Sequence, residues 1–427
     1  MWAMKVAYYR AFQKVMKIFM MFLDWSEPQL LTGPGAIKKL PGVIKDKGIN
    51  NVMIVTDKGL MSLHLLDGLF KQLEEDGISY TVYDGVQPNP SIENIEEARA
   101  QFVANGCQAM IAFGGGSPMD CAKAACARVV RPNKTIPQMR GQLKVMHKLP
   151  PFFAVPTTAG TGSETTLAAV VSNTKTHEKY AINDPCLRPK FAVLDPELTV
   201  GLPPHITSTT GMDALTHAVE AYIGKSNTKS TRDYAEKAVA IIFANLETAY
   251  KDGKNINARG QMLLGSFYGG MAFTRAYVGY VHAVAHNLGG MYGIPHGLAN
   301  AVILPVMLEE YGSAIYPQLS KLANFAGIEG TSDDDKAKKF IAEVYAMNER
   351  MNIPKGFTQI KEEDIPTIVS RALKEANPLY PVPVIFDEDR MTQIVKKLMI
   401  PAHAITHSKK ITKNNLTQQS NTTLNKH

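Results

Sequence analysis

The hydrophobic positions of the chain follow two different periods. Between residues 51 and 196, short apolar runs that end in polar residues or glycine alternate with amphipathic stretches. The apolar runs predict strands at 51–57, 79–86, 108–117, 152–158 and 190–196, and the amphipathic stretches predict helices at 60–75, 91–106 and 118–130. This alternation is typical of a parallel sheet with helices on both faces.

The pattern changes after Thr207, where glycine and proline become sparse within segments and helical periods continue to about residue 400. We therefore expect an α/β dinucleotide-binding domain with a Rossmann-like parallel sheet over residues 26–203, followed by an all-helical domain over 204–400. Residues 401–427 are rich in Asn, Thr, Lys and Gln and are predicted to form a disordered basic tail.

The net charge of +7 raises the question of nucleic-acid binding. The basic excess lies at the two ends, since residues 1–24 hold four cations and one acid and residues 401–427 hold four lysines and no acid. Residues 25–400 are neutral, so a nucleic-acid function is not expected.

The first 25 residues are apolar, but a cation interrupts them every three to five positions. This interruption argues against a spanning helix and against a signal peptide, so no transmembrane segment is expected. We predict an amphipathic helix that docks on its own body or on a partner subunit, with attachment to a membrane surface as the alternative. The four cysteines form no CxxC pair, which favours reduced thiols in a cytoplasmic protein.

A glycine-rich loop, GGGSPMD, joins a predicted strand to a predicted helix. Free amides at such a helix start attract phosphate oxygens. We expect Ser117 to be the N-cap, Pro118 the first helical residue, and Asp120 a capping partner that points back at the loop amides. A turn that binds no ligand is the alternative on the loop alone.

Two further positions follow predicted strands. Asp57 could bind an adenosine ribose diol and repel a 2′-phosphate, which would favour NAD over NADP, or it could simply cap a helix at 58–61. Thr157 and Thr158 offer hydroxyls in a second loop, PTTAGTGSE, at the edge where α/β sheets bind ligands. A plain polar turn explains this second loop equally well.

Histidines gather in the run GYVHAVAHNLGGMYGIPHG. His282 and His286 share one helix face, and the glycines after them are expected to break the helix and leave His296 on a loop. Asp213 and His217 are likewise four residues apart, on the first long helix of the second domain.

Each of these residues taken singly has an ordinary structural explanation, but the set does not. One carboxylate and the three imidazoles of His217, His282 and His296 suit Fe(II) or Zn(II) with one position open. Beside a dinucleotide crevice, such an ion would polarise an alcohol or carbonyl oxygen. The absence of a HExxH pattern argues against a metalloprotease.

Five ordered motifs resemble the iron-containing (group III) alcohol dehydrogenases: GGGSPMDCAK, PTTAGTGSE, DPELTVGLPP, GMDALTHAVEAY and VHAVAHNLGGMYGIPHGLANAVILP. The likeness runs from about residue 26 to residue 400. It implies an α/β cofactor domain and a helical metal domain with the active site between them, an architecture shared with dehydroquinate synthase. It also implies a homodimer or a larger homo-oligomer.

The resemblance assigns roles by position. It implies that Asp213, His217, His282 and His296 bind the metal, while His286 lies near the nicotinamide and transfers a proton. The implied cofactor positions are Asp57, Asn89, Gly115, Gly116, Ser117, Thr157, Thr158, Thr166 and Lys179, together with Gly114 and Asp120 of the glycine loop. Phe273 and Tyr277 flank the metal and are expected to shape the substrate pocket, where this sequence departs from many relatives.

The implied activity is that of an NAD(H)-linked alcohol dehydrogenase or aldehyde reductase. Hydride would pass between a primary alcohol held by Fe(II), or Zn(II), and C4 of the nicotinamide. The alternatives are an enzyme resembling dehydroquinate synthase or glycerol dehydrogenase, or a non-catalytic metal-binding homologue. A lyase of the first kind would need several Lys and Arg around its anionic substrate, and residues 207–300 hold few near the proposed ligands.

Overall fold

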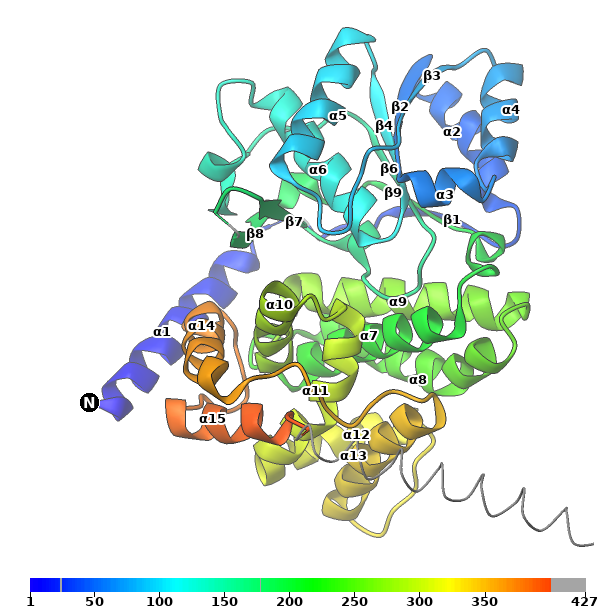
Figure 1. Ribbon diagram of the computed structural model, residues 1–427. Helices are drawn as coiled ribbons and strands as arrows, with labels where there is room; N and C mark the ends of the chain where they lie inside the picture. Colours follow the sequence, from blue (N-terminus) through cyan, green and yellow to red (C-terminus); the bar gives the residue numbers. More distant parts are fainter. Residues whose placement is uncertain (24, 177, 401–427) are drawn as a thin grey trace, which may run out of the picture.

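The computed structural model describes residues 1–23, 25–176 and 178–400. The tail predicted over 401–427 lies outside the described residues. An α/β domain occupies the upper half of Figure 1 and an all-helical domain the lower half. The predicted fold class is therefore confirmed.

The α/β domain is built on a six-stranded sheet in which every neighbouring pair is parallel. The strand order is β1 (Gln29–Thr32), β9 (Phe191–Leu194), β6 (Phe152–Pro156), β4 (Ala109–Gly114), β2 (Asn51–Val55), β3 (Ser79–Tyr83). The central strands β4 and β6 are buried along their whole length, because helices cover both faces.

Two apolar layers enclose the sheet. On one face α5 (Ile92–Ala104) and α6 (Gly116–Val130) pack on the alternate side chains that include Met53 and Met110. On the other face α2 (Leu40–Asp46) and α4 (Asp67–Glu75) pack on those that include Ile54 and Ile111. The alternation of faces along each strand produces this division.

The prediction of a single helix over residues 60–75 is wrong. Two helices occupy this stretch, α3 (Lys58–Ser62) and α4. His64 has a φ of 56° in the turn between them, a left-handed conformation that a continuous helix cannot contain.

A second sheet of three strands was not predicted. It contains β5 (Gly141–Gln142), β8 (Glu178–Asn183) and β7 (Ala168–Asn173), and β7 and β8 pair in antiparallel fashion. These strands extend the α/β domain toward the cavity described below, which β7 and β8 help to line.

The helical domain packs around one apolar core. Its helices are α7 (Pro204–Ile223), α8 (Lys229–Lys251), α9 (Ile256–Ala276), α10 (Tyr280–Tyr292), α11 (His296–Tyr311), α12 (Tyr316–Phe325), α13 (Asp333–Arg350), α14 (Ile365–Ala376) and α15 (Glu388–Lys397). Helix α7 is buried on almost every side, as expected for the centre of a bundle. No helix in the described part of the chain is both long enough and apolar enough to cross a bilayer.

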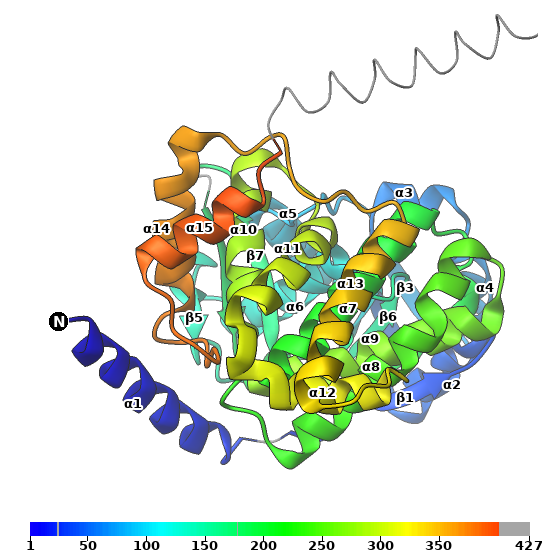
Figure 2. The ribbon, with the colours of Figure 1, turned by 90° about the horizontal axis from the view of Figure 1, so that it is seen from below.

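The amino-terminal helix α1 (Trp2–Met20) stands at the edge of the molecule (Figures 1 and 2) and contacts the connection between α14 and α15. Arg10 donates to the carbonyl oxygens of Val382 and Pro383, at 2.7 and 2.9 Å. The buried Gln13 donates to the carbonyl oxygen of Tyr380 at 2.8 Å. The structure thus shows α1 in contact with its own chain, which is one of the two protein surfaces considered for its docking.

Candidate metal and cofactor site

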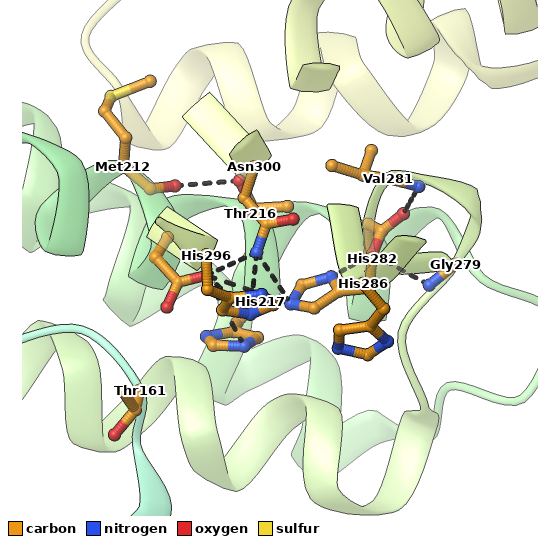
Figure 3. Close-up of polar contacts among 12 residues, drawn as sticks. Thr161, Met212, Thr216, His217, Gly279, Val281, His282, His286, His296 and Asn300 are labelled. Atoms are coloured by element: carbon orange, nitrogen blue, oxygen red, sulfur yellow. Dashed lines mark hydrogen bonds and ion pairs between the residues drawn. The ribbon is translucent and has the colours of Figure 1, made fainter. Parts of the chain in front are cut away.

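Four side chains from three helices converge at one end of the helical domain (Figure 3). Asp213 and His217 belong to α7, His282 to α10, and His296 is the first residue of α11. One donor atom from each lies within 4.8 Å of the others. Asp213 Oδ1 is 4.0, 3.9 and 3.7 Å from Nε2 of His217, His282 and His296 respectively.

Helix geometry explains why these residues meet. The four-residue spacing places Asp213 and His217 on one face of α7. Asp213 lies well inside this helix, so a favourable interaction with the helix N-terminus does not explain its burial.

The prediction that His296 lies on a loop is wrong. Helix α10 continues to Tyr292 and ends at Gly293, whose φ is 67°, and α11 begins at His296.

Burial sets the protonation of the cluster. It lowers the pKa values of His217, His282 and His296 well below the ordinary value, so these imidazoles are neutral and each can offer a lone pair. Burial also raises the pKa of Asp213 to about 7. A cation among these atoms would oppose that rise, because an opposite charge favours the carboxylate.

The amide of Asn300 shows that the cluster lacks donors. Its Nδ2 lies 2.6 Å from Asp213 Oδ1, 3.2 Å from His282 Nε2 and 3.1 Å from His296 Nε2. An amide nitrogen has two hydrogens, so it cannot satisfy three acceptors, and Asn300 Oδ1 is itself buried without a hydrogen-bond partner.

The distances also suit a metal ion. Two atoms that each lie ~2.1 Å from one ion are separated by roughly 3 to 4.2 Å, depending on the coordination geometry. The separations from Asp213 Oδ1, 3.7 to 4.0 Å, fall in this range. The donor set therefore fits a divalent metal.

A carboxylate that the sequence analysis did not consider supports this cluster. Glu220 Oε2 lies 2.7 Å from His282 Nδ1, and the Glu220 carboxylate also accepts the backbone N–H groups of Gly279 and Val281, each at 2.8 Å. The contact holds His282 with Nε2 directed at the cluster. The spacing of Asp213, His217 and Glu220 at i, i+4 and i+7 was a signal that could have revealed it.

His286 lies one helical turn beyond His282 and has a different partner. Its Nδ1 is 2.7 Å from Glu375 Oε1 on α14, which also accepts the hydroxyl of Tyr380 at 3.0 Å. The His286 ring stacks on that of His296, with centroids 5.2 Å apart. Glu375 is distant in sequence, so no spacing could have paired it with His286.

The predicted cofactor residues lie at the carboxyl edge of the parallel sheet, where α/β proteins bind ligands. Asp57 follows β2, residues 114–116 join β4 to α6, and Thr157 and Thr158 follow β6. Lys179 Nζ donates to Asn89 Oδ1 at 2.5 Å. Asp57 Oδ1 accepts the N–H of Leu60 and caps α3, as the alternative interpretation of this residue predicted.

The predicted start of the helix after the glycine loop is wrong in two respects. Gly115 is the N-cap in place of Ser117, whose Oγ accepts the N–H of Asn89 at 3.1 Å. Asp120 does not point back at the loop amides. Its carboxylate accepts Ser163 Oγ and the N–H of Val170, each at 3.1 Å, and so turns away from the place expected for a phosphate.

Lys123, three residues farther along α6, is fully buried beneath the second loop. Its Nζ donates to the carbonyl and hydroxyl oxygens of Ser163 (2.6 and 3.0 Å), to those of Thr166 (3.1 and 2.8 Å), and to Ala168 O (3.1 Å). The Thr166 hydroxyl, predicted to bind cofactor, is thus part of an internal network. The ammonium group fixes the path of the loop.

One cavity of about 360 Å³ connects the two domains. Its lining includes all four residues of the metal cluster together with His286, Phe273 and Tyr277. It also includes six of the eleven residues predicted to bind the cofactor: Asn89, Gly116, Ser117, Asp120, Thr166 and Lys179. The other predicted positions do not line it: Asp57, Gly114, Gly115, Thr157, Thr158.

A parallel α/β domain and a helical domain thus present a glycine loop and a buried Asp–His cluster to the same cavity. These features fit the class of metal-dependent dehydrogenases with two domains. The sequence matches the family model for iron-containing alcohol dehydrogenases over residues 28–196, and that for the C-terminal domain of the Fe-containing alcohol dehydrogenase family over 207–399. The chain belongs to the iron-containing alcohol dehydrogenase family and is an oxidoreductase.

Known proteins agree with this assignment. Alcohol dehydrogenase 4 of Saccharomyces cerevisiae (strain YJM789) is 37% identical over 367 residues, which cover 86% of this chain and 95% of the relative. A solved 1,3-propanediol oxidoreductase is 36% identical with a TM-score of 0.85, covering 88% of this chain and 100% of that one. A sulfoacetaldehyde reductase from Bifidobacterium kashiwanohense in complex with NAD+ is 27% identical with a TM-score of 0.78, covering 88% and 98%.

Proposed function

We propose that this protein is an NAD(H)-linked alcohol dehydrogenase or aldehyde reductase that acts on small or medium primary alcohols with a divalent metal, Fe(II) or alternatively Zn(II). The observation that carries the proposal is the meeting of the Asp–His cluster and the cofactor-loop residues in one cavity. Family membership implies iron and a nicotinamide cofactor, and a solved relative contains NAD+.

Asp213, His217, His282 and His296 would hold the metal, with a fourth neighbouring imidazole, His286, outside the set. Mixed nitrogen and oxygen donors suit both metals. When bound, the ion supplies a Lewis acid for the alcohol or carbonyl oxygen, and the nicotinamide accepts or supplies the hydride. The half-exposed side of His296 faces the cavity, which leaves room for a small ligand.

His286 is the proposed proton carrier. Because Glu375 accepts a hydrogen bond from His286 Nδ1, the neutral ring carries its proton on Nδ1. The lone pair of Nε2 is then available to the cavity. In that state Nε2 can accept the proton that the alcohol loses, and in aldehyde reduction it can return it. Glu375, which also accepts from Tyr380, fixes the orientation of the ring.

The cofactor would lie along the carboxyl edge of the sheet, on the residues predicted for it. Ser117, Asn89 and Lys179 are already joined by hydrogen bonds and line the cavity. Asp57 uses one carboxylate oxygen as a helix cap. We retain its second proposed role, in which the carboxylate binds a ribose diol and disfavours NADPH.

The residues that line the cavity support the competing functions less well. Among the residues that line the cavity, Lys179 is the one cation other than histidine, which is few for a lyase that holds an anionic substrate. A non-catalytic homologue would not need the His286–Glu375 pair within the cavity. A glycerol dehydrogenase-like specificity remains an outcome that a substrate panel can distinguish.

The test is anaerobic turnover by protein loaded with Fe(II), with NADH or NADPH and a panel of aldehydes that includes glyceraldehyde. We expect oxidation of NADH with small and medium aldehydes and much slower oxidation of NADPH. No turnover of any aldehyde by protein with metal and NADH bound would refute the dehydrogenase proposal. Equal use of NADPH would refute the ribose role of Asp57 and leave its capping role.

We further infer a cytoplasmic homo-oligomer with a domain division at residues 203/204. The family resemblance supports the assembly, and the free thiols of the four cysteines support a reducing compartment. Light scattering on the purified protein measures the assembly directly, and a monomeric mass would refute it.

A further inference from the structure

We propose that α1 forms a wall of the substrate pocket and that Met20 determines how long an alcohol the pocket accepts. This inference rests on the proposed function. Met20, the last residue of α1, is buried and lines the same cavity as the Asp–His cluster.

The cavity wall can be followed from the cluster to α1. The Phe273 ring stacks on that of His217, with centroids 4.0 Å apart, and so covers the metal cluster. Tyr277 lies four residues later, one turn or ~5.4 Å along the direction of α9. Tyr277 and Met20 both line the main cavity, and both also line a smaller cavity beside it. The smaller cavity includes neither Phe273 nor any residue of the Asp–His cluster, so we place Met20 on the side of the pocket away from the cluster.

Tyr277 has a conformation that is suited to this junction. Its φ of 68° is unusual for a residue with a side chain, and it terminates α9. The Tyr277 hydroxyl is buried without a hydrogen-bond partner among the described residues. The pocket at this point is thus formed by a constrained aromatic ring and the flexible thioether of Met20.

Hydrogen bonds hold α1 against the connection between α14 and α15. Gln13 donates to the carbonyl oxygens of Pro378 and Tyr380, at 3.2 and 2.8 Å, and Arg10 donates to two carbonyls in the same connection. This connection also presents Leu379 and Tyr380 to the cavity. Helix α1 and the connection therefore form one side of the pocket together.

The end of α1 is fixed as well. Trp25 Nε1 donates to the Met20 carbonyl oxygen at 2.7 Å, and the guanidinium groups of Arg188 and Arg275 lie over the Trp25 ring, 5.6 and 5.5 Å from its centre. Residues 1–27 precede the segment that matches the family model. Met20 is thus a feature of this chain and not of the matched family segment.

The distance from the cluster determines the expected effect. An alcohol of two carbons held at the cluster is too short to reach Met20, whereas a chain of about six carbons spans more than one helical turn. Met20→Ala should raise the ratio of kcat/KM for hexanol over ethanol about five- to tenfold, and Met20→Trp should lower it by a similar factor. Ile18→Ala, an exposed apolar position on the same helix, is the matched control and should leave the ratio unchanged.

A second measurement does not depend on turnover. The chain has two tryptophans, so in a Trp2→Phe background Trp25 is the single reporter beside Met20. Hexanol should change Trp25 fluorescence with a Kd that Met20→Ala shifts and Ile18→Ala does not. Unchanged selectivity in both Met20 variants, together with an unchanged hexanol Kd in Met20→Ala, would overturn the proposal. Absence of turnover with a Met20-dependent hexanol Kd would instead refute the proposed function and support the wall.

Discussion

Two buried polar clusters, one around Lys123 in α6 and one around Asp213 in α7, differ in whether they contain their own cation. Around Lys123 the chain supplies both the cation and the oxygens that surround it. Around Asp213 it supplies a carboxylate and three imidazole nitrogens, with the Asn300 amide as the shared donor. We call the first cluster complete because it contains its own cation, and the second incomplete because it contains none.

The difference shows two ways in which buried charged groups can be compensated, by partners in the chain or by a bound ligand. Burial of a charge costs free energy unless partners compensate it, and Lys123 has such partners. Burial lowers the pKa of Lys123 to about 8, which still leaves the ammonium form in the majority at neutral pH. The Asp213 cluster has the same cost without an internal cation. The contacts within the chain therefore explain the first cluster, and the proposed metal would supply the missing positive charge in the second.

The largest expected effect concerns the incomplete cluster. His282→Ala should empty the metal site and lower kcat/KM for aldehyde reduction by about 10³-fold or more, since the Lewis acid is lost. Metal content by atomic absorption together with anaerobic turnover measures both effects. His286→Ala is the contrast, with slower turnover and metal retained. If His286→Ala also lost the metal, the division between ligand and proton carrier would be wrong.

A substitution of Lys123 in the complete cluster should lower the free energy of unfolding and leave the metal content unchanged. Lys123→Met removes the cation and leaves buried oxygens without a donor, so the free energy of unfolding should fall by about 3–5 kcal/mol. Denaturant unfolding measures this change. The remaining folded protein should still bind metal at the wild-type stoichiometry. Loss of metal from folded Lys123→Met would remove the distinction between the clusters.

A Glu220 variant tests whether metal binding depends on the hydrogen bond that orients His282. Glu220→Gln keeps the shape but weakens the partner of His282 Nδ1, so metal affinity should fall about 10- to 100-fold. Competition with a chelator measures the affinity. An unchanged affinity would mean that helix packing alone orients His282.

The smallest expected effect comes from Glu164, an imperfect member of the Lys123 cluster. Its Oε1 is buried without a hydrogen-bond partner, and burial raises the pKa of Glu164 to about 7. Because the folded pKa is raised, its contribution to stability is full below pH ~4.5 and is lost as the pH rises through ~7. Glu164→Gln should therefore become more stable than wild type over that window, by about 1–2 kcal/mol. A stability difference that does not change with pH would contradict the raised pKa.

The sequence predicted those parts of the molecule that depend on local spacing. Long apolar runs revealed β2, β4 and β6, and the i, i+4 pairs identified the residues that gather around Asp213. It did not predict β1, which has four residues and no buried side chain, or the β7–β8 hairpin, in which buried apolar residues alternate with partly exposed ones and no long apolar run forms.

The missed contacts depend on tertiary structure. Asp120 turns toward Ser163 and Val170 because the second loop packs against α6, and no local rule for helix starts includes that loop. Glu375 reaches His286 from another helix. The ligand and cofactor roles themselves stay predictions until the variants above are measured.

Tyr380 connects the amino-terminal helix to the proposed proton path. Its carbonyl oxygen accepts Gln13 of α1, and its hydroxyl donates to Glu375, the partner of His286. A heritable change in the first 27 residues can therefore alter both the shape of the pocket and the position of the proton carrier, while Asp213 and its neighbouring imidazoles remain as they are. After gene duplication, new substrate ranges could arise by variation in this segment, with the inherited metal chemistry preserved.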